Sequence, residues 1–80
     1  MVGAEERKEY NAADILKEVY AALSKKGYDP VSQVVGYIMS GDPSYVTNYH
    51  GARNLITKVD REELLEEIMT EYMREAPWEK

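Results

Sequence analysis

The chain has 80 residues, a net charge of −5 and no cysteine. A chain of this length forms one domain with a small core, and the lack of cysteine excludes disulfides and zinc sites built from thiolates. Because no apolar run approaches the roughly 20 residues of a transmembrane helix and the N-terminus is charged, we expect a cytoplasmic protein without membrane insertion.

The first strong helical pattern begins after residues 1–10, which have no apolar period and are predicted to form a flexible tail. Residues 12–26 form the first predicted helix, with Asn11 as its cap and Gly27 as its stop. Apolar side chains repeat there at helical spacing: Ile15, Leu16, Val19, Tyr20 and Leu23.

Asp29 and Pro30 are typical of a helix start, and Gly41 of a helix end. The apolar face predicted between them consists of Val31, Val34, Val35, Ile38 and Met39. Gly36, inside this helix, costs about 1 kcal/mol relative to alanine. Close packing against a neighbouring helix explains it better than a hinge does.

The same pair of residues, Asp42 and Pro43, then predicts a short helical turn over residues 44–46. A third helical pattern covers residues 50–57. Asp60 opens the last helix, which Pro77 ends, and its apolar stripe consists of Leu64, Leu65, Ile68, Met69, Tyr72 and Met73.

These elements predict an all-α domain over residues 11–75, a compact bundle of about four to five short helices, followed by a loose C-terminal tail over residues 76–80. No segment alternates long enough to be a strand. A small core with several continuous apolar stripes favours a homodimer.

No catalytic, cofactor-binding or metal site is predicted. His50 is the only histidine, and it is interpreted as a surface or packing residue. The pairs Glu62-Glu63 and Glu66-Glu67 are interpreted as a solvated helix face, because dicarboxylate metal sites usually draw their ligands from several helices.

Tyrosine occurs seven times and phenylalanine not at all. Tyr20, Tyr28 and Tyr37 are predicted to lie in the core, with their hydroxyls reaching the surface. A second group combines aromatic and basic side chains in the least regular part of the chain, which is typical of protein interfaces. This candidate partner surface consists of Tyr45, Tyr49, His50, Arg53, Lys58 and Arg61. The alternative is a folded loop anchored by its own aromatic rings.

A second hypothesis is a DNA-binding regulator of helix-turn-helix type, whose recognition helix would carry His50, Arg53 and Asn54. Acidic residues outnumber basic ones from Asp60 onward, and such a surface repels phosphate backbones. Nucleic acid is therefore the less favoured partner. A small-molecule sensor with a pocket between helices is a weaker third hypothesis.

The order of several short motifs is distinctive. Gly-Tyr-Asp-Pro begins at Gly27, Gln-Val-Val-Gly-Tyr at Gln33 and Ser-Gly-Asp-Pro at Ser40; Ala-Arg-Asn-Leu-Ile follows at Ala52. Together they resemble the IreB family of small regulatory phosphoproteins from Gram-positive bacteria, over about residues 11–73.

The resemblance implies a cytoplasmic, helical, dimeric protein without enzymatic activity. Family members are substrates of a transmembrane Ser/Thr kinase with extracellular PASTA repeats. They act, as negative regulators where this is known, in the control of cell-envelope stress and cephalosporin resistance. The resemblance thus implies as partners a Ser/Thr kinase or a downstream regulatory protein.

The family's phosphoacceptors are threonines of the N-terminal tail, but residues 1–23 contain no serine or threonine. No phosphosite is carried over to this chain. The remaining hydroxyls, most of them in predicted helices or caps, are those of Ser24, Ser32, Ser40, Ser44, Thr47, Thr57 and Thr70.

Overall fold

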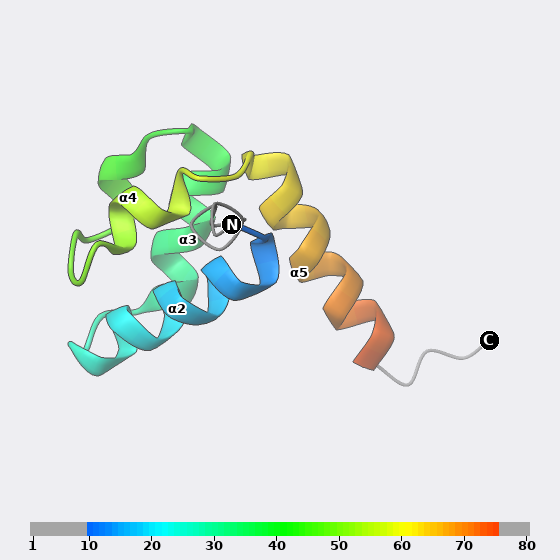
Figure 1. Cartoon of the computed structure of the whole chain (residues 1–80), viewed down its shortest axis with the longest axis horizontal. Coiled ribbons are helices and arrows are strands. Elements are labelled where there is room, and N and C mark those ends of the chain that lie inside the picture. Colours follow the sequence, from blue (N-terminus) through cyan, green and yellow to red (C-terminus); the bar gives the residue numbers. More distant parts are fainter. Residues whose placement is uncertain (1–9, 76–80) are drawn as a thin grey trace, which may run out of the picture.

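The computed structural model describes residues 10–75, which form four α-helices and one 3-10 turn (Figure 1). In chain order the elements are α2 (Ala12–Lys25), α3 (Pro30–Ser40), η1 (Pro43–Tyr45), α4 (Ala52–Ile56) and α5 (Arg61–Glu75). Within this range there is no strand, and the predicted all-α fold is confirmed. The two predicted tails, residues 1–10 and 76–80, lie outside the described residues except for Tyr10.

Helix α2 begins and ends where its capping residues predict. The Asn11 side chain accepts a hydrogen bond from the first turn. At the other end Gly27 has a φ of 89°, its N–H donates to the Ser24 carbonyl at 3.0 Å, and the Tyr28 N–H donates to the Leu23 carbonyl at 2.9 Å. This pair of bonds is a Schellman motif, which explains the glycine.

Helix α3 follows the same rules. The Asp29 carboxylate accepts hydrogen bonds from the N–H groups of Val31 and Ser32, and Pro30 occupies the first turn. Gly41 closes the helix with a φ of 79°. Both predicted ends are confirmed.

Helix α4 is shorter than its predicted range of residues 50–57. His50 and Gly51 have φ values of 53° and 74°, and this left-handed backbone cannot belong to a right-handed helix. The helix therefore begins only at Ala52, and it ends at Ile56.

The core lies around α2, which contacts α3, α4 and α5. The buried residues on α2 recur at helical spacing and form a single stripe. The full core consists of Ala12, Ile15, Val19, Leu23, Val34, Tyr37, Val46, Ala52, Ile56 and Leu64.

Two of the three tyrosines predicted to lie in the core are exposed. Tyr37 is 6% exposed, whereas Tyr20 is 59% and Tyr28 is 41% exposed. Tyr20 lies about 100° around the helix from Val19, which faces the core. Tyr28 follows the helix stop in the connection to α3. The prediction was wrong for these two residues because the buried stripe is narrower than the apolar pattern.

On α3 and α5, too, fewer residues are buried than the apolar pattern predicts. On α3, Val34 is buried, but Val31, Val35 and Met39 are exposed. On α5, Leu64 alone is buried. Figure 1 shows α5 at one side of the molecule, running away from the other helices toward its C-terminal end. The predicted stripes thus exist, but the core of one chain covers only part of them.

Candidate functional site

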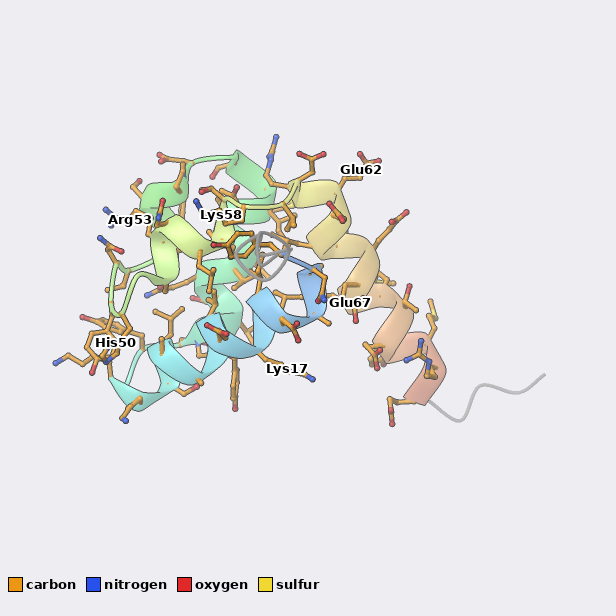
Figure 2. All side chains as sticks on the ribbon, viewed as in Figure 1. Lys17, His50, Arg53, Lys58, Glu62 and Glu67 are labelled. Carbon is orange, nitrogen blue, oxygen red and sulfur yellow. The ribbon has the colours of Figure 1, made fainter. Side chains whose placement is uncertain are left out.

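The six residues of the candidate partner surface do not gather into one cluster. They extend from η1 through α4 to the first residue of α5, and each makes contacts of its own. Figure 2 shows His50 near the C-terminus of α2, whereas Arg53 and Lys58 lie above it, on and after α4. The structure therefore divides five residues of the predicted surface into three parts and places Lys58 apart from them.

The first part is an aromatic corner before α4. The rings of Tyr49 and His50 meet edge to face, with centroids 4.2 Å apart and an interplanar angle of 65°. The Lys26 Nζ lies 5.2 Å from the centroid of the Tyr49 ring, within the range of a cation–π contact. His50 and Lys26 are exposed, so this corner is available to a partner.

The second part consists of two arginines that hold backbone carbonyls. Arg53 Nε donates to the Val46 carbonyl at 2.9 Å, and Arg61 Nη1 donates to the Ile38 carbonyl at 2.9 Å. The Arg61 guanidinium also lies against Gly41, where a β-carbon would approach it to 3.0 Å. Arg53 thus holds α4 to the loop that follows α3, and Arg61 holds the start of α5 to the end of α3.

The third part is Tyr45, whose ring lies on Gly36. A β-carbon at residue 36 would come within 2.5 Å of Cδ1 of this ring. The predicted close packing at Gly36 is therefore confirmed, although its neighbour is the η1 turn and not a helix. Lys58, by contrast, extends its Nζ to 5.7 Å from the centroid of the Tyr10 ring.

The loop that carries these residues, residues 41–51, is fixed by side chains. Gln33 forms two hydrogen bonds to Thr47: its Nε2 donates to the hydroxyl at 3.0 Å, and its Oε1 accepts from the backbone N–H at 2.8 Å. Asp42 accepts from the Ser44 N–H at 3.0 Å and from the Ser44 hydroxyl at 2.8 Å. These bonds from Ser44 hold the pKa of Asp42 below its ordinary value, and the Arg53 charge acts in the same direction.

The apolar stripes that favoured a homodimer leave an exposed apolar face that spans α2, α3 and α5. At its centre is a groove of about 280 Å³, lined by Leu16, Tyr20, Pro30, Val31, Val34, Val35 and Ile68. Beyond the groove, on α3 and α5, lie Met39, Leu65, Met69, Tyr72 and Met73, all exposed. The signal was present in the sequence, since the apolar stripes hold more residues than a core of this size can bury.

Metal and nucleic-acid chemistry find little support in this geometry. Among residues 10–75, no three His, Cys, Asp or Glu side chains are placed to hold a metal ion. Of the four glutamates at the start of α5, Glu62, Glu63 and Glu66 are exposed and Glu67 is half-buried. Helix α4, the candidate recognition helix, has five residues, and its Arg53 is turned to the Val46 carbonyl. Nor does any helix in residues 10–75 combine the length and apolarity needed to cross a bilayer.

Comparison with known proteins agrees with the motifs. Residues 1–74 match the family model described as IreB regulatory phosphoprotein. The chain is 60% identical over 60 residues to a UPF0297 protein of Lachnoclostridium phytofermentans, an alignment that covers 75% of this chain and 68% of the relative. It is 52% identical over 76 residues to a UPF0297 protein of Acetivibrio thermocellus, covering 95% and 84% of the two chains. Together with the helical fold, these matches show that the chain belongs to the IreB family.

Proposed function

We propose that this protein is a non-enzymatic regulator that acts by binding other proteins, and that its first partner is a second copy of itself. The observation that carries the proposal is the exposed apolar face of α2, α3 and α5. Contiguous apolar surface of this kind marks interaction sites in soluble proteins.

A second copy suits this face because the face holds both a groove and a ridge. The groove lies where α2 meets α3 and includes Tyr20, Val31 and Val35. The ridge lies on the C-terminal half of α5 and includes Met69 and Met73. In a two-fold symmetric dimer the ridge of each protomer enters the groove of the other. The same contact is therefore formed twice, and both grooves and both ridges are covered.

Sedimentation equilibrium at micromolar concentration tests this proposal. We expect the wild-type protein to be a dimer and Met69→Glu to be a monomer, because a buried charge at residue 69 would oppose association. Thr70→Glu is the matched control, since it places the same charge at the next residue of α5, which is exposed and polar. A wild-type protein that sediments as a monomer with full helicity would overturn the dimer.

The family resemblance supports a more specific role. We infer that the protein is a cytoplasmic phosphoprotein in the pathway of a transmembrane Ser/Thr kinase with PASTA repeats, which controls cell-envelope stress and cephalosporin resistance. The aromatic corner of Tyr49, His50 and Lys26 is the part of the candidate surface that suits a further partner, because its side chains are not occupied with backbone carbonyls.

Two measurements test this role. Deletion of the gene is expected to change the cephalosporin concentration that inhibits growth, and the wild-type gene is expected to restore it. The purified protein is expected to bind the cytoplasmic domain of the kinase, and Tyr49→Ala is expected to bind more weakly. Lys17→Ala, at an exposed residue of α2 outside both the corner and the groove, is expected to bind as the wild type does. Unchanged resistance in the deletion strain, together with no kinase binding, would overturn it.

A further inference from the structure

The serine and threonine residues of the sequence all fall between positions 24 and 70, within the described part of the chain. A kinase must seat the acceptor hydroxyl in its own active site, so residues within the hydrogen-bonded backbone of a helix are poor acceptors. The hydroxyls on α-helices are those of Ser24, Ser32, Ser40 and Thr70. Thr57 caps α4 and donates to the Asn54 carbonyl at 2.8 Å.

Ser44 and Thr47 remain, and both lie in residues 41–51, the longest connection between the described α-helices. Thr47 is half-buried, and its hydroxyl accepts from the Gln33 amide. Ser44 is exposed, and its hydroxyl donates to the Asp42 carboxylate in the same turn. Ser44 is therefore the exposed hydroxyl that lies outside the four α-helices and their caps.

We propose that Ser44 is a phosphoacceptor of an ATP-dependent protein Ser/Thr kinase and that Arg53 binds the resulting phosphate. The proposal rests on the proposed function as a phosphoprotein and names its site. The Ser44 Oγ attacks the γ-phosphorus of MgATP and forms the Oγ–P bond. The bond from that phosphorus to the β,γ-bridging oxygen breaks, ADP leaves, and the hydroxyl proton passes to the catalytic base of the kinase.

The local contacts explain why a phosphate would change the structure. A phosphoserine carries a charge of about −1.5 to −2 at neutral pH. At Ser44 it would replace a hydroxyl that lies 2.8 Å from an Asp42 oxygen, so a hydrogen bond becomes a repulsion between like charges. Asp42 also holds the Ser44 N–H, and the η1 turn loses its cap when the carboxylate moves away.

Arg53 is the cation placed to take up the new charge. Its Nε lies 2.9 Å from the carbonyl of Val46, two residues beyond Ser44, and its charge already acts on Asp42. Guanidinium groups bind phosphate through two parallel hydrogen bonds, which are stronger than one bond to a neutral carbonyl. The phosphate thus draws Arg53 from Val46, and the turn that carries Tyr45 is released from Gly36.

The first test is phosphorylation of the purified protein with ATP and the catalytic domain of a Ser/Thr kinase from the same genome. Cleavage after Lys26 and Arg53 gives a peptide of residues 27–53, and fragmentation of this peptide locates the phosphate. We expect it on Ser44, and we expect Ser44→Ala to lose at least about tenfold of the incorporation. Ser32→Ala, in the same peptide, is the control and should be phosphorylated as the wild type is.

Equal incorporation in Ser44→Ala, phosphate on another hydroxyl only, or no incorporation in the wild type would each overturn the site. Phosphate on another hydroxyl would reject Ser44 but keep the proposed phosphoprotein, whereas no incorporation in the wild type would remove the phosphoprotein from the proposed function as well. The dimer and the resistance assay do not depend on either result.

The second test concerns Arg53 and uses protein with phosphoserine incorporated at residue 44 during translation. The NMR resonance of the Arg53 Nε–H is expected to shift on phosphorylation and to return after phosphatase treatment. The Arg61 Nε–H, on the other arginine that holds a carbonyl, is expected to stay in place. An unmoved Arg53 resonance would overturn the role of Arg53.

Discussion

The ring of Tyr45 occupies the space that a side chain at Gly36 would need, since a β-carbon there would lie 2.5 Å from the ring's Cδ1. Gly36→Ala therefore sets two effects against each other. Alanine favours the helix by about 1 kcal/mol, whereas displacement of a packed ring costs about 1 to 3 kcal/mol. We expect urea denaturation followed by circular dichroism to show no gain in stability.

The comparison with Tyr45→Ala isolates the contact. In the Tyr45→Ala background the ring is gone, so Gly36→Ala is expected to stabilise the protein by up to about 1 kcal/mol. If the changes in stability caused by Gly36→Ala and Tyr45→Ala simply add, the contact with the Tyr45 ring is not the reason for a glycine at residue 36.

Arg61 is expected to stabilise the fold more than an ordinary surface charge does. Its guanidinium donates to the Ile38 carbonyl near the end of α3, so Arg61→Ala should lower the free energy of unfolding by about 1 kcal/mol. Arg74→Ala is the control, because its ion pair with Glu71 is exposed and should contribute less than about 0.5 kcal/mol. If urea denaturation shows the same loss of unfolding free energy for both variants, the hydrogen bond to Ile38 stabilises the fold no more than an exposed ion pair does.

The amide of Gln33 is expected to govern the opening of the loop. Gln33→Ala leaves the N–H and the hydroxyl of Thr47 without their partner, at a cost of about 1 to 2 kcal/mol. Hydrogen exchange at the Thr47 amide should accelerate accordingly. Thr47→Ser keeps the hydroxyl that accepts from the amide and should exchange almost as slowly as the wild type, and a fast Thr47→Ser would contradict the role of this bond.

Asp42 gives the loop a dependence on pH. Its pKa lies below the ordinary value of 3.8, because Ser44 donates two hydrogen bonds to the carboxylate and Arg53 is near. A carboxylate with a depressed pKa stabilises the fold above the ordinary value, and this stabilisation is lost as the pH falls through the pKa of the folded state.

Asparagine caps a turn as aspartate does but does not titrate. The difference in melting temperature between the wild type and Asp42→Asn is therefore expected to be constant from neutral pH down to about 3.8 and to shrink below it. If the difference in melting temperature stays the same below pH 3.8, the titration of Asp42 does not affect the stability of the fold. In Ser44→Ala, which keeps only the backbone donor, the change should be smaller.

The helix ends were predictable because their causes are local. Asn11, Asp29 and the glycines at 27 and 41 act on backbone groups within a few residues, and the structure places them at the helix termini. The depth of burial was less predictable. Tyr20 has the periodicity of a core residue, but whether another helix covers it depends on contacts distant in sequence.

In the candidate surface, too, the local features could be predicted and the contacts between distant residues could not. Aromatic and basic residues between 45 and 61 were recognised from composition, yet the bonds from Arg53 and Arg61 join residues 7 and 23 positions apart. No local pattern shows which carbonyl an arginine reaches. The apolar stripes of α2, α3 and α5 could be seen in the sequence, but which of their residues stay exposed depends on contacts distant in sequence.

Helix α5 has one buried side chain, Leu64, in its first turns, and this has a consequence for the lifetime of the protein. Unravelling from the C-terminal end breaks no core contact, so proteases should reach the segment around Tyr72 long before the rest unfolds. Association through the same segment would shield it. The rate of turnover would then fall as the amount of protein rises, and the cell would keep a pool that persists only above a threshold of abundance.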